Sequence, residues 1–287
     1  MLLERAPAKV NLTLRVIGRR VDGYHDIGSL VAFAREGDSV SFAPGGDLAL
    51  TVRGPTASAA GAETDNLVLK AARALAAQVD GLKLGSFTLD KHLPVAAGLG
   101  GGSADAAAAL RLLAQANGLE GDPRLLAAAR ATGADVPVCL DPRSRLMCGI
   151  GDVLTAPLAL PPLAAVLVNP GVAVATKDVF AALGLAPGQA RMAAPDATAI
   201  PTQRPDLLAF LAGQANDLEG AAISLAPAIA DVLAALRARP GCHLARMSGS
   251  GATCFALFGS SDAATAAARA VETAHRDWWI RATVLGA

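Results

Sequence analysis

The sequence predicts an α+β fold in two lobes. Strand-like and helix-like segments mix along the chain without a repeat and without strict strand–helix–strand alternation. With 287 residues, the chain is long enough for one large domain or for two lobes with their own cores. Pro161 and Pro162 mark a plausible boundary between two lobes, because a strand-like segment begins again after them. We therefore expect an N-terminal lobe at 1–160 and a C-terminal lobe at 161–287.

The composition favours a globular protein that acts on a small molecule. Hydrophobic residues make up 53% and charged residues 17% of the chain, which excludes a disordered protein. The formal net charge is zero and aromatic residues are only 3%, so no nucleic-acid partner is indicated. No apolar run is long enough for a membrane span, and the N-terminus lacks a signal-peptide core. We expect a cytoplasmic protein without membrane contact; its oligomeric state is not specified.

The first third of the chain predicts strands around one helix. Polar and apolar residues alternate from Lys9 to Val16, the pattern of a half-buried strand, with Lys9 and Asn11 on the polar face. Asp22-Gly23 favours a turn, after which residues 27–33 return as a partner strand. The other expected elements are strands at 48–53 and 87–89, and a helix at 67–78 capped by Thr64 or Asp65.

The remainder predicts alternating helices and strands. Asp122-Pro123 has the pattern of a helix N-cap followed by proline, and Gly133 ends that helix. The other expected elements are a strand at 164–169, helices at 206–211, 218–224 and 228–238, a glycine-turned hairpin at 246–258, a helix from Asp262 and a strand at 280–285.

A glycine cluster precedes the most helix-prone segment. PVAAGLGGGSADA, residues 94–106, has four glycines in five residues, and an alanine-rich helix follows, with Ser103 as its expected N-cap and Gly118 just past its end. Glycines let the backbone approach a ligand, and a helix N-terminus directs free N–H groups toward it. The segment therefore predicts a phosphate-binding loop; the alternative is a flexible connection between a strand and a helix.

Three familiar phosphate-binding signatures do not fit this cluster. A P-loop requires a lysine after the glycines, and none is present. The dinucleotide fingerprint requires a third glycine where Ser103 stands. His275-Arg276-Asp277 imitates a protein-kinase catalytic loop, but Ala282 replaces its asparagine and no D-F-G follows.

Three stretches in order resemble the motifs of the GHMP kinases. They are APAKVNLTLRVIGRRVDGYH at 6–25, LPVAAGLGGGSADAAAAL at 93–110 and MSGSGATCFALF at 247–258, and GADVP at 133–137 adds a fourth match. The middle stretch differs from the common form of the family's ATP loop in having Gly101-Gly102 before Ser103. The resemblance implies a two-lobed GHMP kinase fold, with an N-terminal lobe similar to domain 2 of ribosomal protein S5 and a ferredoxin-like α+β C-terminal lobe.

The resemblance also implies a reaction, the ATP-dependent phosphorylation of a small-molecule hydroxyl with Mg²⁺. The triple glycine and GRRVDGYH resemble the branch that phosphorylates the C2 hydroxyl of cytidine diphospho-methylerythritol, in the non-mevalonate route to isoprenoids. Family members that act on mevalonate, homoserine or a sugar lack this form. A catalytically silent member of the fold would lack Lys9, Asp135 or the glycine loop, and all are present.

Individual roles follow from the same resemblance. Asp135 is implied as the general base and Lys9 as the cation that steadies the developing alkoxide; the alternatives are a turn or cap aspartate and a solvated strand lysine. Tyr24 is implied to stack on cytosine and His25 to bind its polar edge, with Phe180 as a second stacking ring or a plain core residue. Asn11 is a further substrate-site candidate.

The remaining candidates surround the nucleotide. Gly249, Ser250 and Gly251 of the third motif are expected to close over the site, and Ser103 is either a magnesium ligand or only a helix cap. The expected ATP-binding residues are Asn66, Lys91, Pro94, Val95, Ala96, Ala97, Gly98, Leu99, Gly100, Gly101, Gly102, Ser103 and Ala104. The alternatives are a helix-start asparagine for Asn66, a strand-end lysine for Lys91 and an ordinary glycine hairpin for the third motif.

The four cysteines do not indicate a metal site. They have no C-x-x-C spacing and only weakly placed histidines nearby, so reduced thiols in the core of a cytosolic protein are expected. These residues are Cys139, Cys148, Cys242 and Cys254.

Overall fold

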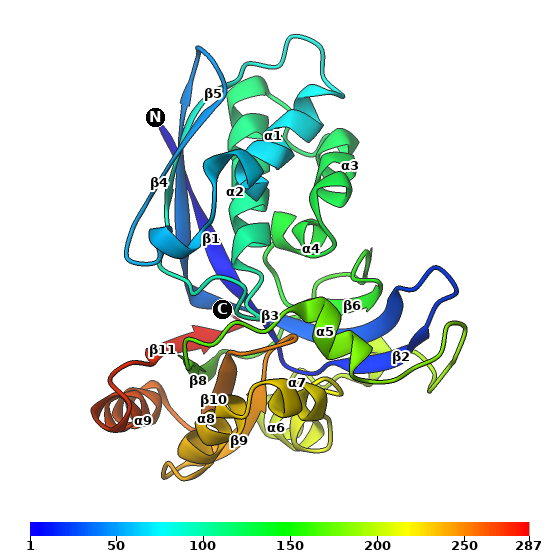
Figure 1. The fold of residues 1–287 in the computed structure, drawn as a ribbon, viewed down its shortest axis with the longest axis vertical. Coiled ribbons are helices and arrows are strands. Elements are labelled where there is room, and N and C mark those ends of the chain that lie inside the picture. Colours follow the sequence, from blue (N-terminus) through cyan, green and yellow to red (C-terminus); the bar gives the residue numbers. More distant parts are fainter. Residues whose placement is uncertain (287) are drawn as a thin grey trace. The chain divides into compact units, whose positions relative to one another are not determined.

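The computed structural model describes residues 1–286 and divides into two compact units (Figure 1). The first unit comprises residues 1–9, 36–95 and 100–142, and the second comprises residues 10–35, 96–99 and 143–287. The lobe boundary expected near residue 160 would separate consecutive halves of the chain, whereas these units interleave along it; that boundary stays a prediction.

The first unit is a sheet with helices on one face (Figure 1). Residues 39–44 of β3 pair antiparallel with β5, β4 pairs parallel with β5, and β1 pairs with β3. Phe42 and Phe87 face each other in this register and stack at 4.5 Å, which anchors the sheet side of the core. The strands are β1 (Leu2–Asn11), β3 (His25–Pro44), β4 (Ala49–Arg53) and β5 (Gly85–Asp90). The helices are α1 (Leu67–Ala76), α2 (Gly101–Asn117), α3 (Pro123–Thr132) and α4 (Val136–Leu140), with short 3₁₀ turns at Ala57–Ala59 and Glu63–Asp65.

Helix α2 is the centre of this unit because its side chains are small. Residues 104–110 are all buried, and α1, α3 and α4 pack against the helix. Alanine allows this many neighbours to approach one helix while keeping the highest helix propensity. The glycine loop is thereby attached to the most tightly enclosed element of the unit.

The second unit contains an antiparallel sheet in the order β11-β8-β10-β9. All seven residues of β8 are buried, and α8 and α9 pack on the sheet. Residues 25–31 of β3 pair antiparallel with β2 and β6. The strands are β2 (Arg15–Arg19), β6 (Arg145–Gly149), β7 (Val153–Leu154), β8 (Leu163–Asn169), β9 (Cys242–Met247), β10 (Cys254–Phe258) and β11 (Trp279–Leu285). The helices are α5 (Thr176–Ala181), α6 (Arg204–Ala212), α7 (Glu219–Leu225), α8 (Ala228–Arg237) and α9 (Ser261–Ala274), with a 3₁₀ turn at Ala197–Ala199.

Most predicted elements are confirmed, and the α+β class with them. The exception among the strands is the segment from Lys9 to Val16, which is not one strand. The N–H groups of Leu12 and Thr13 both donate to the carbonyl of Leu30, at 2.8 and 3.4 Å. Two residues therefore oppose one, as in a bulge, and the chain breaks between β1 and β2.

Two predicted helix caps were wrong. Asn66, rather than Thr64 or Asp65, caps α1, because its side-chain oxygen accepts a hydrogen bond from the N–H of Val68 at 2.9 Å. Helix α2 begins at Gly101 with Gly100 as its N-cap, so Ser103 lies inside the first turn. Gly100 has φ +62°, a left-handed conformation that glycine adopts without strain, and this lets the helix begin earlier than the serine suggested.

Candidate active site

An ion pair joins two elements of the first unit that are far apart in sequence. Lys9 lies on β1, and its Nζ is 2.8 Å from Oδ2 of Asp135, at the start of α4. The lysine side chain is 5% exposed and that of the aspartate 35%, so the ammonium is buried while the carboxylate opens partly to solvent. Asp135 makes no side-chain cap hydrogen bond to α4. The alternative of a solvated strand lysine is thus excluded, and so is the alternative of an aspartate whose side chain caps the helix.

The glycine loop passes directly over this pair. A Cβ on Gly100 would lie 3.2 Å from Cε of Lys9 and 3.8 Å from Oδ2 of Asp135. Lys9, Asp135 and the start of α2 are therefore brought together within one unit. Glycine is suited to position 100 for two reasons: it adopts the left-handed backbone conformation without strain, and it has no Cβ to crowd Lys9.

The first turn of α2 presents free backbone donors. Its first helical hydrogen bond is from the N–H of Ala104 to the carbonyl of Gly100, at 2.8 Å. The N–H groups of Gly101, Gly102 and Ser103 precede that bond and have no partner within the helix. Together with the positive end of the helix dipole, three such amides form an anion site.

Gly101 and Gly102 are not required by the packing of the protein. A Cβ at either position would meet its nearest neighbour at 3.5 or 3.4 Å, which is ordinary van der Waals contact. Gly102 is exposed and Gly101 half-buried. Packing alone would thus tolerate a small side chain at either position, so the two glycines are not explained by close contacts within the protein.

The second unit holds the other part of the glycine loop against the third motif. The carbonyl of Gly98 accepts a hydrogen bond from Oγ of Ser248 at 2.9 Å, and the N–H of Thr253 donates to the carbonyl of Ala97 at 3.1 Å. A Cβ on Gly98 would lie 2.3 Å from the carbonyl oxygen of Ser248, and one on Gly249 would lie 3.0 Å from that of Gly98. Here the glycines serve close packing of two loops.

Asn11 and Ser250 take part in the same set of contacts. The backbone N–H of Asn11 donates to Oγ of Ser248, and its side-chain amide donates to Ser29. Oδ1 of Asn11 is buried and accepts no hydrogen bond from the described residues. Such an orphaned acceptor is costly unless a ligand supplies a donor. Ser250 exchanges a hydrogen bond with Thr176 at 2.8 Å.

Two of the three aromatic candidates are stacked. The rings of His25 and Phe180 lie 4.7 Å apart at an interplanar angle of 28°. Phe180 is half-buried rather than a core residue, and Tyr24 is 61% exposed. Nε2 of His25 is buried and has no partner among the described residues, and burial, followed by the nearby Arg19, lowers the pKa of this histidine.

The other expected nucleotide-site residues differ in exposure. Val95, Ala96 and Gly102 are exposed, and Ala96 has φ +52°, which is uncommon for a residue other than glycine and typical of strained functional loops. Pro94, Gly98, Gly100 and Gly101 are half-buried. Ala97, Leu99 and Ala104 are buried, so their backbone rather than their side chains would face a ligand.

Comparisons with known proteins agree with this arrangement. Residues 66–141 match the family described as GHMP kinases N terminal domain, and residues 197–277 match GHMP kinases C terminal. A protein of Xanthobacter autotrophicus named 4-diphosphocytidyl-2-C-methyl-D-erythritol kinase is 59% identical over 99% of both chains. One of the same name from Methylobacterium radiotolerans is 60% identical over 99% of both chains. The chain belongs to the GHMP kinase family.

Solved structures support the same assignment for this GHMP kinase. A crystal structure of 4-(cytidine 5'-diphospho)-2C-methyl-D-erythritol kinase matches with a TM-score of 0.80 and 35% identity over 100% of both chains. A homoserine kinase from Cytophaga hutchinsonii matches with a TM-score of 0.68 at 19% identity, covering 99% of this chain and 94% of that one, and shares the fold alone. As a GHMP kinase, the chain is an ATP-dependent kinase with the two-lobed fold of the family.

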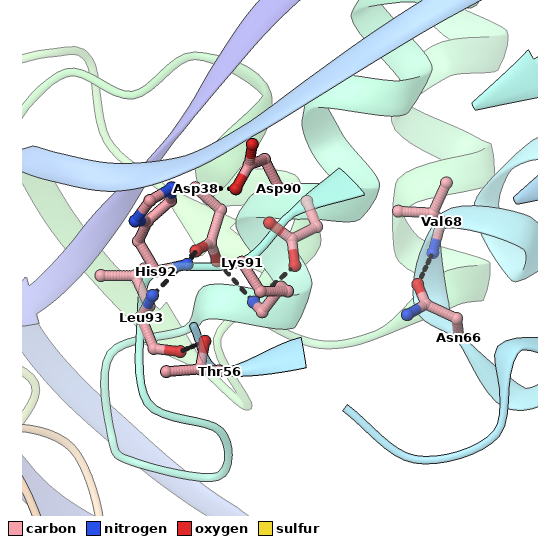
Figure 2. A network of polar contacts seen from close by, with 9 residues as sticks. Asp38, Thr56, Asn66, Val68, Asp90, Lys91, His92 and Leu93 are labelled. Atoms are coloured by element: carbon pink, nitrogen blue, oxygen red, sulfur yellow. Dashed lines mark hydrogen bonds and ion pairs between the residues drawn. The ribbon is translucent and has the colours of Figure 1, made fainter. Parts of the chain in front are cut away.

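Two expected ATP-site residues of this GHMP kinase already have protein partners. Asn66 caps α1, and the ammonium of Lys91 donates to the carboxylate of Asp38 (Figure 2). The same ammonium also donates to Asp105. Lys91 is only 3% exposed. Asp38 and Asp105 were not predicted, because each stands alone in its local sequence and only the fold reveals their partner.

Within residues 1–286, no three histidine, cysteine, aspartate or glutamate side chains gather as a metal-binding group. The four cysteines are free thiols, and Cys139 and Cys254 are buried as expected. Cys148 and Cys242 are only half-buried, so the expectation of core positions was wrong for these two. None of the described helices combines the length and apolar character needed to cross a membrane.

Proposed function

We propose that this GHMP kinase transfers the γ-phosphoryl group of ATP to the C2 hydroxyl of 4-diphosphocytidyl-2-C-methyl-D-erythritol, giving the 2-phosphate and ADP. The product would enter isoprenoid precursor synthesis by the non-mevalonate route. The observation that carries the proposal is the Lys9–Asp135 pair lying beneath the glycine loop, at the start of α2. Full-length relatives with 59–60% identity that are named for this reaction support the choice of substrate.

The first unit would supply the groups that act on the reacting atoms. Phosphoryl transfer depends mainly on positioning and on stabilising charge. The free amides of Gly101, Gly102 and Ser103 would hold the nucleotide phosphates. Asp135 would accept the proton of the tertiary C2 alcohol, which is a poor nucleophile without a base. Lys9 would hold that carboxylate in place by its 2.8 Å contact and offset the negative charge that develops on the oxygen.

The second unit would recognise the cytidine. A lowered pKa keeps the imidazole of His25 neutral at pH 7, so one ring nitrogen can accept a hydrogen bond from the amino group of cytosine. Phe180 and the exposed Tyr24 offer aromatic faces on which the base can stack. Oδ1 of Asn11 is a further free acceptor for a substrate hydroxyl.

Mg²⁺ would enter the proposed site with the nucleotide. No cage of acidic side chains is present among residues 1–286, and Asp38 and Asp105 are occupied by Lys91. This fits a magnesium ion held chiefly by phosphate oxygens and water, with the hydroxyl of Ser103 as the candidate protein ligand. When bound, the ion would neutralise charge on the transferring phosphoryl group. ATP, a nucleotide substrate and free thiols suit the cytoplasm, where we propose the enzyme works.

The test is a panel of acceptors with the purified chain, ATP and Mg²⁺. ADP release would be measured with 4-diphosphocytidyl-2-C-methyl-D-erythritol, mevalonate, homoserine and galactose. We expect kcat/KM for the cytidine compound to exceed the others by at least about 10²-fold, because an unpaired His25 acceptor disfavours substrates without the base. Equal or better turnover of mevalonate or homoserine would overturn the assignment.

A further inference from the structure

A buried cluster of three charges lies in the first unit beside the glycine loop. Nζ of Lys91, just after β5, donates to the carboxylate of Asp38 on β3 (Figure 2). It also donates to Oδ2 of Asp105 on α2, at 2.8 Å. The three side chains are 4%, 3% and 0% exposed in the order Lys91, Asp105, Asp38. We call Asp38, Lys91 and Asp105 the Lys91 cluster.

The Lys91 cluster reaches both ends of the loop. Oδ1 of Asp38 accepts the backbone N–H groups of His92 and Leu93, the latter at 2.8 Å (Figure 2). Those two residues immediately precede Pro94, where the loop begins. Asp105 belongs to the first turns of α2, where the loop ends. One ammonium therefore links the strand side of the loop to its helix side.

The cluster also underlies the free amides. A Cβ on Gly101 would lie 3.5 Å from Nζ of Lys91 and 3.7 Å from Oδ2 of Asp38. The backbone that presents the first N–H donor of α2 thus rests on the cluster. A shift of the Lys91 side chain would reach this backbone through Asp105, which belongs to the same helix.

Burial leaves Lys91 charged and tightly held. Desolvation lowers the pKa of Lys91, but the attraction of Asp105 and Asp38 outweighs it, so the pKa is raised overall. Burial, with the charge of Asp38, raises the pKa of Asp105 to about 7 against the opposing effect of Lys91. A buried group of charges adds little stability compared with an apolar core, but it permits few geometries. Its effect is to fix positions.

We propose that Lys91 is a positioning residue for the nucleotide phosphates, not a nucleotide ligand: through Asp38 and Asp105 it fixes both ends of residues 92–105 so that the amides of Gly101, Gly102 and Ser103 converge. Two of its three ammonium donors are used inside the protein, and 3% exposure leaves no surface for a base or phosphate. The kinetic part of this inference rests on the proposed kinase function, and the structural part does not.

The test compares Lys91→Met with Lys91→Met/Asp38→Asn. In the single variant two buried carboxylates face each other without a cation, so the loop should loosen. In the double variant the asparagine that replaces Asp38 keeps an oxygen for the N–H groups of His92 and Leu93, and its NH₂ can donate to Asp105. Lys70→Met, on an exposed position of α1, makes the same chemical change away from the cluster.

Two readouts are needed for each variant. Hydrogen exchange of residues 94–105 is measured without nucleotide, and KM for ATP is measured beside KM for the acceptor. We expect Lys91→Met to speed loop exchange and raise KM for ATP by at least about tenfold, since displacements near 1 Å cost up to about 10²-fold. KM for the acceptor should stay within about twofold. The double variant should recover most of both losses, and Lys70→Met should match wild type.

The alternative, in which Lys91 binds the nucleotide directly, predicts a different result. Lys91→Met would then raise KM for ATP with unchanged loop exchange, and Asp38→Asn would not rescue it; either result overturns the proposal. If Lys91→Met does not fold, Asp105→Asn and Asp105→Leu are compared instead. Asp105→Asn keeps an acceptor for Lys91 and should retain slow hydrogen exchange of the loop, whereas Asp105→Leu should lose it. Equal exchange in these two variants would refute the proposal. If the wild type phosphorylates no acceptor, the proposed function fails, but the exchange comparison still decides the role of Lys91.

Discussion

Asp135→Asn removes the proposed proton acceptor with little change in shape. In the native pair, Oδ2 of Asp135 lies 2.8 Å from Nζ of Lys9, and the carboxylate is 35% exposed toward solvent. Asparagine keeps an oxygen that can accept from Lys9 but cannot take the proton of an alcohol. General-base catalysis contributes about 10²–10⁴-fold, so kcat should fall by that factor, or roughly 3–5 kcal/mol of barrier.

The effect on stability should be much smaller. Lys9 stays hydrogen-bonded, and the lost charge attraction belongs to a pair with one partly solvated member. We expect a loss of about 1 kcal/mol, which lowers the Tm of a chain of this length by about 2–4 °C. KM for ATP and for the acceptor should change less than about threefold, because neither depends on proton transfer.

Asp122→Asn provides the matched control. Asp122 stands before a helix that has proline at its start, as Asp135 does, but its side chain does cap: it accepts a hydrogen bond from the N–H of Arg124 at 2.8 Å. Asparagine caps nearly as well, so kcat and Tm should both match wild type. Steady-state kinetics and thermal unfolding of the two variants decide the matter. If Asp135→Asn keeps kcat within about threefold of wild type at equal stability, Asp135 is not the base.

Three further predictions use other parts of the structure. Gly102→Ala should leave Tm unchanged or higher but weaken ATP binding in calorimetry. Gly98→Ala should lose at least about 2 kcal/mol of unfolding free energy, because its Cβ would lie 2.3 Å from a backbone carbonyl and the residue has φ +75°. Equal stability of the two variants would contradict this. His25 should titrate below 6.5 in NMR, and a midpoint above 6.5 is the contrary result. Because the unfolded chain binds the proton more readily, stability should fall as the pH drops from 6.5 to the lowered pKa of the folded state, and acceptor affinity should fall as the pH drops through that lowered pKa. Burial raises the pKa of Cys139 to about 12 and also that of Cys254, so neither should react with iodoacetamide in the native protein at about pH 8, as mass spectrometry after brief labelling can show.

Local sequence patterns predicted the elements whose signals are local. The Asp122-Pro123 cap and the ending of α3 before Gly133 both depend on neighbours within a few residues. The half-buried strand expected from the alternation between Lys9 and Val16 was wrong, because Lys9, Asn11 and Thr13 are buried as well as their apolar neighbours. The strands and helices expected after residue 160 are likewise present, most of them displaced by one or two residues at their ends. Two strands are longer than predicted: β3 continues to Pro44 instead of ending near residue 33, and β9 begins at Cys242 instead of near residue 246.

Helix starts were harder because a cap is a conformation as well as a residue type. Ser103 has a good capping side chain, but Gly100 can adopt φ +62°, and the helix therefore begins at Gly101. Asn66 was expected at the nucleotide site, with an ordinary helix-start asparagine as the alternative, and its side chain does close the first turn of α1. The Lys9–Asp135 contact spans 126 positions and came from the family resemblance, not from any local pattern.

The Lys91 cluster shows what determines a site that no local pattern predicts. In sequence, Asp38, Lys91 and Asp105 are three isolated charges of the kind that usually face water. Their burial follows from strand register: Ser39 pairs with Asp90, so Asp38 and Lys91 come next to each other where β3 and β5 lie side by side. A register shift of one residue would point one of these side chains to the other face of the sheet. The same register that buries Phe42 against Phe87 therefore also sets the charge that anchors the glycine loop, and core packing and nucleotide binding depend on one alignment of two strands.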